Sequence, residues 1–237
     1  MDTLEYLKNQ LSPKDWEILQ GLGLNLDGKI IAEMWPDFVD FEKRWKTEIP
    51  FLLDKLKNYK DPKVFDSALG AGVTSIGLKL AGIKNIISNE IDEEFRKVAL
   101  QQAKKYGVSL TITQYDWREL PDELTETFET VLCEGNSLSC LFKREDRLKA
   151  LRSFKKILKP DGKLIIDERN YDRILRGDYN FKGNVIYCGL DKVECLPIYV
   201  SDSMVVFQYT HKQTGKRAHI VAYPFKRGEL LELLKQV

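Results

Sequence analysis

Two closely spaced glycines and a later acid form the most distinctive pattern in the sequence. Residues 66–72 read Asp-Ser-Ala-Leu-Gly-Ala-Gly after a short apolar run, and Glu90 follows Gly70 by about 20 positions. Glycines at a turn from a strand to a helix let the backbone approach a ligand closely, and an acid at the end of the next strand can accept both hydroxyls of a ribose. The spacing therefore predicts a nucleoside site, although any tight turn of this kind can use two glycines.

The residues around the glycines favour one nucleoside cofactor over another. A dinucleotide site carries a third glycine where this sequence has Ser75, and Asp66 stands on the strand just before the turn. The pattern D-x-x-x-G-x-G suits S-adenosylmethionine, because its charged amino-acid end needs the amides of the turn and a nearby acid. An NAD-dependent dehydrogenase is the alternative that Ser75 disfavours.

Three further strand ends carry polar or aromatic residues. Asp116 and Trp117 follow one predicted strand. Residues 134–137, Glu-Gly-Asn-Ser, follow the next strand, and Arg169 follows the last. The indole can bind the face of adenine, and the carboxylate can bind its amino group. A guanidinium can bind a substrate carboxylate through two hydrogen bonds. The alternatives are a place in the core for Trp117 and a salt bridge to a neighbouring acid for Arg169.

The hydrophobic pattern predicts strands and helices that alternate along the chain and bring these residues together. The predicted strands are residues 63–66, 85–89, 109–114, 130–133 and 163–167, and the predicted helices are residues 74–80, 93–106 and 144–158. Such alternation predicts an α/β protein with a Rossmann-like, doubly wound and mostly parallel sheet over residues 61–172. The carboxyl ends of parallel strands meet at one edge of a sheet, where ligands bind.

The segments before and after this core differ from it in character. Residues 1–60 are predicted to be a helical lead-in, residues 173–226 an antiparallel β insertion that covers the substrate site, and residues 227–237 a terminal helix that returns to the core. The elements expected in these segments are a helix from Ser12 to Gly21 or Gly23, a break at 35–38, a helix over 44–56, strands over 184–188, 193–200, 204–211 and 217–223, and a helix over 227–235.

The composition indicates a globular protein. Of the 237 residues, 43% are hydrophobic, and 37 basic against 36 acidic side chains leave a net charge of +1. A nearly neutral chain with interspersed charges is not expected to bind nucleic acid, and no apolar run approaches the roughly 20 residues of a membrane helix. The first ten residues lack the pattern of a signal or transit peptide, so a cytoplasmic location is expected.

Cysteine and histidine are too sparse to predict a metal site. The four cysteines contain no C-x-x-C pair, and the chain has two histidines. We therefore expect reduced, largely buried thiols and no metal ion. Cys133 lies near the predicted site, but its apolar neighbours favour a packed thiol over a nucleophile.

The sequence resembles the class I S-adenosylmethionine-dependent methyltransferases, and among them the glycine and glycine/sarcosine N-methyltransferases, over residues 35–223. Residues 66–72 and Glu90 match a pattern shared by many methyltransferases, while residues 135–137 and 167–172 match the narrower family. The resemblance implies transfer of a methyl group to the amine of glycine, sarcosine or a related small molecule, which leaves S-adenosylhomocysteine. It implies that the enzyme aligns the reactants for in-line transfer without an acid–base side chain.

The resemblance also implies roles for individual residues. Those implied to bind the cofactor are Trp35, Phe38, Arg44, Asp66, Ala68, Gly70, Gly72, Glu90, Asp116, Trp117 and Gly135. Those implied to bind the amine are Asn136, Arg169, Tyr187, Tyr209 and Tyr223, of which Asn136 and Arg169 position it. Within the cofactor set, Arg44 is implied to hold the methionyl carboxylate and Glu90 the ribose.

Three features depart from the family pattern. Glu134 stands where these enzymes usually have an apolar residue, Glu168 replaces a residue that is often histidine, and two further C-terminal strands of the sheet are expected to be absent. Either acid can alter the amine that is accepted. The alternatives are a methyltransferase for another small amine and a non-catalytic S-adenosylmethionine-binding protein, and both a monomer and a homo-oligomer fit the sequence.

Overall fold

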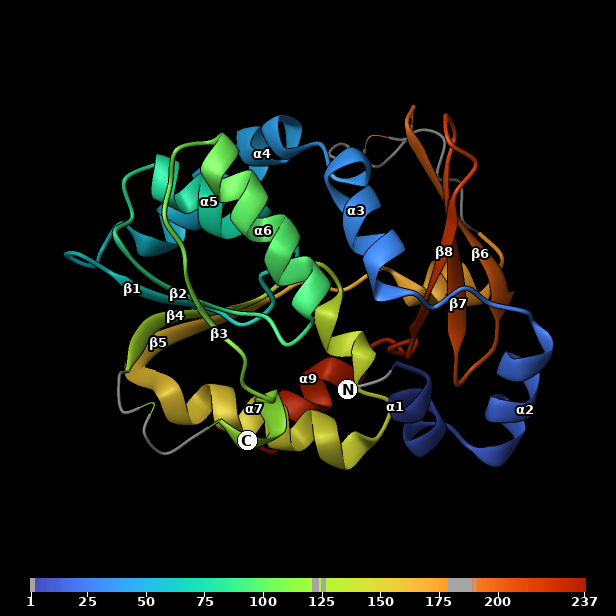
Figure 1. Ribbon diagram of the computed structural model, residues 1–237. Helices are drawn as coiled ribbons and strands as arrows, with labels where there is room; N and C mark the ends of the chain where they lie inside the picture. The colour runs from blue at the N-terminus through green and yellow to red at the C-terminus, as the bar shows by residue number, and fades with distance from the viewer. Residues whose placement is uncertain (1–2, 121–123, 125–126, 179–188, 190) are drawn as a thin grey trace.

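A five-stranded parallel sheet forms the centre of the molecule in the computed structural model (Figure 1). The structure describes residues 3–120, 124, 127–178, 189 and 191–237. The strands are β1 Lys63–Asp66, β2 Asn85–Asn89, β3 Thr111–Thr113, β4 Phe128–Cys133 and β5 Leu158–Ile166. They lie in the order β3-β2-β1-β4-β5, and every neighbouring pair is parallel. The predicted doubly wound α/β sheet is therefore confirmed.

Helices cover both faces of this sheet (Figure 1). One face carries α4 Phe41–Leu56, α5 Val73–Leu80 and α6 Glu93–Lys105, and the other carries α7 Arg144–Ile157 and α9 Glu229–Leu234. Every residue of β4 is buried, including Phe128, Val131 and Cys133. Burial without alternation is what a central strand of a parallel sheet requires, because helices cover it on both sides.

A second, smaller sheet is antiparallel and lies beside the first (Figure 1). It contains β6 Val193–Val200, β7 Val205–His211 and β8 Arg217–Ala222 in that order. Helix α3 Gly28–Phe38 packs against both β8 and α6, so it joins the two sheets. The predicted antiparallel insertion is confirmed for these strands, while the strand predicted at 184–188 lies outside the described residues.

Several predicted boundaries are wrong, and local interactions explain the differences. The break predicted at residues 35–38 falls inside α3, because Pro36 lies in the last turn and Val39 N still donates to Trp35 O at 2.8 Å. Helix α4 begins at Phe41 instead of Arg44, because Asp40 caps it by accepting from Lys43 N at 3.1 Å.

One strand is longer than predicted, and the structure contains helices that the sequence did not predict. Strand β5 begins at Leu158, where its first residue pairs with Phe128 before a register shift. Helices α1 Thr3–Gln10 and α8 Tyr171–Leu175 were not predicted, and α2 Pro13–Gly21 agrees with the helix expected after Ser12. No strand follows β8 among the described residues, in which α9 is the last element.

A close helix contact fixes α5 against α4 beside the ligand edge of the sheet. Trp45 Nε1 donates to Val73 O at 2.6 Å, and the ring lies over Gly77. A Cβ added to Gly77 would stand 2.5 Å from Trp45 Nε1 and 2.7 Å from Ile49 Cδ1. Position 77 therefore has no room for a Cβ, although glycine is less favourable than alanine in a helix by about 1 kcal/mol.

We expect Gly77→Ala to lower the free energy of unfolding by about 1–2 kcal/mol, because overpacking outweighs the gain in helix propensity. Chemical denaturation measures the change. Gly21→Ala is the matched control, because Gly21 is also helical and nothing lies within 4 Å of its added Cβ. A Gly77→Ala variant as stable as Gly21→Ala would show that the contact between α4 and α5 is looser than the structure indicates.

Candidate active site

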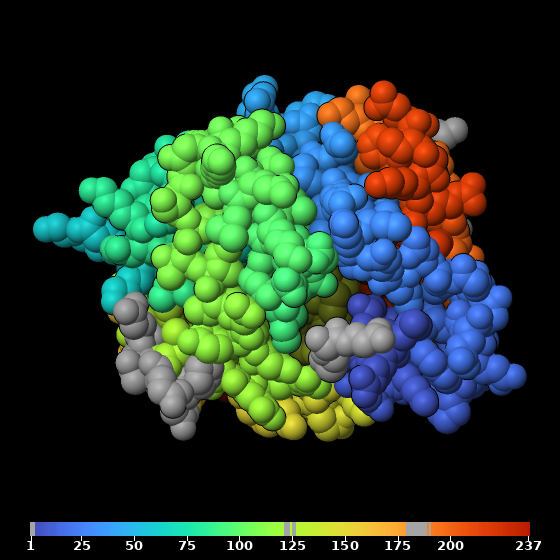
Figure 2. All heavy atoms as spheres, in the orientation of Figure 1, coloured from blue at the N-terminus to red at the C-terminus, as the bar shows by residue number. Residues whose placement is uncertain are grey.

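A cavity of about 1210 Å³ lies at the carboxyl ends of the parallel strands. Its wall includes residues that follow β1, β2, β4 and β5, together with residues of α1, α3, β7 and β8. Figure 2 shows its opening as a recess between α6 and the N-terminal helices. Eleven of the residues implied by the resemblance lie on its wall: Trp35, Arg44, Ala68, Gly70, Glu90, Asp116, Trp117, Gly135, Asn136, Arg169 and Tyr209.

The glycine turn after β1 is built on a buried carboxylate. Asp66, 2% exposed, accepts hydrogen bonds from Ser75 Oγ at 2.6 Å and Ala68 N at 3.3 Å. Burial raises its pKa to about 6. Gly70 and Gly72 have φ of 52° and 91°, which glycine adopts without strain. Asp66 therefore supports the turn, and both Asp66 and Gly72 are off the cavity wall, while Ala68 and Gly70 are on it.

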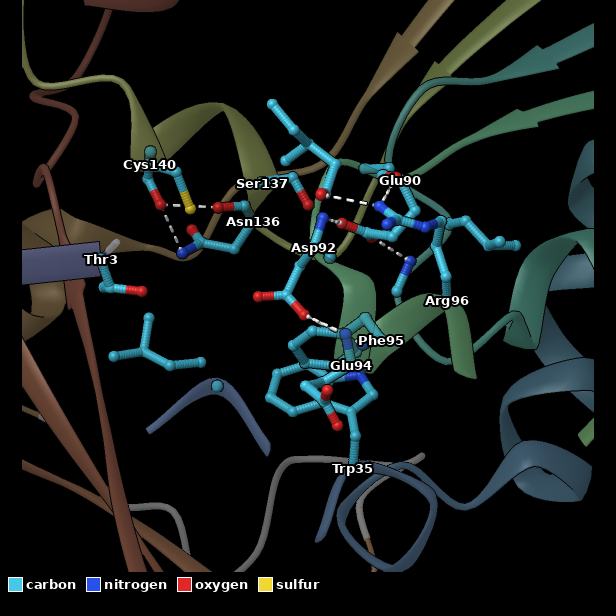
Figure 3. Close-up of a pocket in the computed structure, with 18 of the residues that line it drawn as sticks. Thr3, Trp35, Glu90, Asp92, Glu94, Phe95, Arg96, Asn136, Ser137 and Cys140 are labelled. Carbon is cyan, nitrogen blue, oxygen red and sulfur yellow. Dashed lines mark hydrogen bonds between the residues drawn. The ribbon is translucent and has the colours of Figure 1, made fainter. Parts of the chain in front are cut away.

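Glu90 lies at the end of β2 and is tied to the glycine turn. Its Oε2 accepts from Gly70 N at 2.8 Å, and its Oε1 accepts from Asp92 N at 2.9 Å. Burial raises its pKa to about 7. Figure 3 shows Glu90, Asp92 and Arg96 together on one side of the cavity, with Asn136 and Ser137 on another. Each carboxylate oxygen of Glu90 keeps a lone pair with which it can accept a ligand hydroxyl.

Asp116 and Trp117 stand at the end of the third strand. Trp117 Nε1 donates to Ser67 O at 2.7 Å, which holds the indole against the turn after β1. Asp116 forms an ion pair with Arg118, whose Nη2 lies 2.5 Å from Asp116 Oδ2. Although burial favours the neutral acid, the hydrogen bonds and charge of Arg118 hold the pKa of Asp116 below its ordinary value.

Asn136 joins the ends of β4 and β5. It adopts a left-handed φ of 66°, and its backbone N–H donates to Asp167 Oδ1 at 2.8 Å. Its side-chain amide donates to Ser139 Oγ and Tyr171 Oη, both at 2.8 Å, and its Oδ1 accepts from Arg169 N at 3.0 Å. These contacts fix the orientation of the amide. Tyr171 and Ser139 belong to this network, and no spacing rule in the sequence singled them out.

Arg169 is held by the antiparallel sheet. Its Nη2 donates to Tyr209 Oη at 3.0 Å, and its guanidinium lies over the ring of Phe207, 4.4 Å from the centroid. Both aromatic residues lie on β7 and line the cavity. The sheet therefore presents a fixed, planar cation to the cavity, as recognition of a carboxylate requires.

Arg44 and Trp35 complete the wall on the side of the N-terminal helices. Arg44 is 5% exposed and forms an ion pair with Glu48, one turn further along α4. Trp35 contacts Tyr209 and Phe95, each with 5.7 Å between ring centroids. Phe38 is off the wall and supports it, because its ring packs edge-on against Tyr209 at 5.0 Å.

The structure does not bring Tyr223 to the cavity. Its hydroxyl donates to Glu229 Oε1 at 2.9 Å, and the Arg147 guanidinium lies 3.8 Å from its ring centroid. These partners hold the side chain on the far side of β8 from Tyr209. Tyr187 lies outside the described residues. Among the described residues, no cluster of three or more His, Cys, Asp or Glu can hold a metal ion, and no helix is long and apolar enough to cross a membrane.

Glu168, next to Arg169 in the sequence, is partly buried, and both of its carboxylate oxygens are buried. Neither of its carboxylate oxygens has a hydrogen-bond partner among the described residues. Burial, and then the charge of Asp167, raise its pKa from 4.5 to about 8. Between these values the folded protein keeps a proton that the unfolded chain releases, so stability falls as the pH rises through this interval.

We expect Glu168→Gln to raise the free energy of unfolding by about 1–2 kcal/mol at pH 9, since it removes an unpaired buried charge. The gain shrinks at pH 5, where the carboxyl is protonated. Denaturation at both pH values tests this. Glu129→Gln is the control, and it should lower the free energy of unfolding. Glu129 is also buried, but it pairs with Lys159 and accepts from Lys63 N at 2.7 Å. An equal effect of Glu168→Gln at both pH values would contradict the raised pKa of Glu168.

Comparison with known proteins identifies the family. Residues 64–162 match a methyltransferase domain family. The chain is 34% identical to a glycine/sarcosine N-methyltransferase of Aphanothece halophytica, over 87% of this chain and 77% of that protein, and 32% identical to one of Halorhodospira halochloris, over 87% and 76%. An S-adenosylmethionine-dependent methyltransferase of Clostridium acetobutylicum has the same fold, with a TM-score of 0.63, 18% identity and coverage of 87% and 83%. The chain therefore belongs to the glycine/sarcosine N-methyltransferase family of S-adenosylmethionine-dependent methyltransferases.

Proposed function

We propose that this enzyme methylates the amino nitrogen of glycine and sarcosine. The observation that carries the proposal is the guanidinium of Arg169, which Tyr209 and Phe207 hold at the cavity beside Asn136. A guanidinium held rigidly on the wall of a cavity fits a small substrate that carries a carboxylate. The names of the relatives from Aphanothece halophytica and Halorhodospira halochloris support the same substrate class.

The residues on the cavity wall fit S-adenosylmethionine. Glu90 is proposed to accept the ribose hydroxyls, and Trp117 and Asp116 to contact the adenine. The backbone of Ala68 and Gly70 is proposed to approach the methionyl part beside Gly135, and Arg44 to hold its carboxylate. The buried, unpartnered Oε2 of Glu134 on this wall supports a ligand at this place, because a protein rarely leaves such an atom unpaired.

The chain's own residues are proposed to act by positioning. When bound, S-adenosylmethionine supplies a methyl group that its sulfonium makes transferable. Arg169 binds the carboxylate of the amino acid, and Asn136, fixed by its own hydrogen bonds, orients the nitrogen. Alignment of two reactants lowers a reaction barrier by about 7–11 kcal/mol. No side chain needs to act as a nucleophile.

The first prediction is turnover on the proposed amines. The purified protein is incubated with S-adenosylmethionine and, in parallel, with glycine, sarcosine or dimethylglycine, and formation of S-adenosylhomocysteine is followed. We expect turnover with glycine and sarcosine above a control without amine. S-adenosylhomocysteine binding with turnover on none of the three would overturn the proposed substrate class.

The second prediction concerns Arg169. Loss of a charge-assisted contact is worth about 1.5–3 kcal/mol, so Arg169→Ala should raise the KM for sarcosine about tenfold to a hundredfold. Its affinity for S-adenosylhomocysteine, measured by calorimetry, should change less than about threefold. Arg173→Ala is the matched control, because Arg173 is an arginine four residues later that pairs with Asp178 but is exposed and off the cavity wall.

Two results would contradict this role for Arg169. Equal losses of affinity for sarcosine and for S-adenosylhomocysteine would show that the guanidinium supports the whole cavity and not the amine alone. An unchanged KM would show that the carboxylate binds elsewhere.

A further inference from the structure

We propose that Glu134 binds the α-ammonium group of the methionyl end of S-adenosylmethionine and makes this site selective for ligands that carry it. The inference rests on the proposed placement of the cofactor in the cavity. It assigns a ligand to a side chain that stands where the resembled family usually has an apolar residue.

Glu134 is a buried carboxylate on the cavity wall with an unused acceptor. It directly follows β4 and is 9% exposed. Its Oε2 has no hydrogen-bond partner among the described residues. A buried carboxylate oxygen without a donor is unfavourable in the folded protein, so Oε2 is the atom to which a donor from outside the chain can bind. A ligand in the cavity is in the position to supply it.

The surroundings of Glu134 require that donor to be a cation. The charged side chains that face it are Arg44 and Glu48 from α4, Asp66 from the end of β1 and Asp167 from beyond β5. Burial raises the pKa of Glu134, and repulsion by Glu48 adds to this more strongly than attraction by Arg44 opposes it. One guanidinium thus faces several acids. A positive charge added by a ligand offsets the excess of negative charge around Glu134.

The neighbouring acids already have donors of their own. Glu48 pairs with Arg44 and accepts from Thr74 Oγ1 at 2.7 Å, and Asp66 accepts from Ser75 Oγ at 2.6 Å. Asp167 Oδ1 accepts from a backbone N–H at 2.8 Å. Among these four acids, Glu134 is the one with a buried oxygen that has no donor among the described residues.

Arg44 beside Glu134 matches the methionyl end group by group. An α-amino acid carries a carboxylate and an ammonium on one carbon, and the guanidinium and the carboxylate of these two residues have the complementary charges. Arg44 and Glu134 are each among the charges that act most strongly on the other. The pair therefore serves the cofactor, and Arg169 remains with the amine.

Titration with two nucleosides tests the proposal without any amine substrate. S-adenosylhomocysteine carries the α-ammonium group, and 5′-methylthioadenosine lacks the whole amino-acid end. Glu134→Gln and Glu134→Leu should weaken S-adenosylhomocysteine binding about tenfold to a hundredfold, the range for a hydrogen bond to a charged group. Binding of 5′-methylthioadenosine should change less than about threefold. Glu129→Gln, on the same strand but off the cavity wall, should change neither affinity.

Thermal unfolding of the ligand-free variants separates this effect from damage to the fold. Both Glu134 variants should unfold at the same temperature as the wild type or higher, because they remove a buried carboxylate with an unpaired oxygen. The isosteric Glu134→Gln keeps the test valid if Glu134→Leu does not fold.

Proton release gives a second readout. An ammonium group favours the ionised carboxylate, so binding should expel the proton that burial keeps on Glu134. Affinity for S-adenosylhomocysteine should therefore rise with pH above the ordinary pKa of a glutamate, and the rise should be smaller in Glu134→Gln. Calorimetry in two buffers of different ionisation enthalpy should show more protons released by the wild type than by Glu134→Gln.

Several outcomes would overturn the proposal. Equal losses for both nucleosides, or unchanged S-adenosylhomocysteine binding with a raised KM for sarcosine, would remove the α-ammonium group as the ligand of Glu134. Equal affinities of the wild type for both nucleosides would do the same. A wrong choice of amine in the proposed function leaves these titrations unchanged, so the two proposals fail separately.

Discussion

The turn after β1 depends on a carboxylate that is buried beneath it. Asp66 accepts from Ser75 Oγ and from the Ala68 amide, and Ser75 Oγ lies 2.8 Å from Ser88 Oγ on β2. One group of hydrogen bonds thus ties the end of β1, the first turn of α5 and the neighbouring strand together. The glycines above it are free to take left-handed φ values. The side of the cavity that we propose binds the cofactor takes its shape from this arrangement.

The site contains several buried acids that lower the stability of the fold. Burial raises the pKa of Asp66 to about 6, of Glu90 to about 7 and of Glu168 to about 8, and it raises that of Glu134 as well. Each of these groups opposes folding when it is ionised. Acids gathered at one sheet edge are typical of a site that is completed by a ligand, and natural proteins accept such a loss of stability where function requires it.

The side of the cavity that we propose binds the amine is built by contacts between the two sheets. Arg169 follows β5, while Tyr209, which accepts from its guanidinium, lies 40 residues later on β7. Trp35 on α3 packs against the same tyrosine, so the helix that joins the sheets also fixes the wall. Asn136 connects β4 and β5 through Asp167 and the Arg169 amide. The positioning of a small amino acid that we propose therefore depends on both sheets at once.

The sequence by itself determined the parallel sheet, the glycine turn with Glu90 at the next strand end, and the presence of Asn136 and Arg169 at the same edge. These features follow from hydrophobic periodicity and from spacing along one strand or turn, which are local properties. Only the tertiary structure decided that Asp66 supports the turn from below, that Tyr209 faces the cavity while Tyr223 pairs with Glu229, and that Glu134 is buried beside Arg44. The direction of each of these side chains depends on partners from other elements, and the spacing of residues along the chain carries no information about those partners.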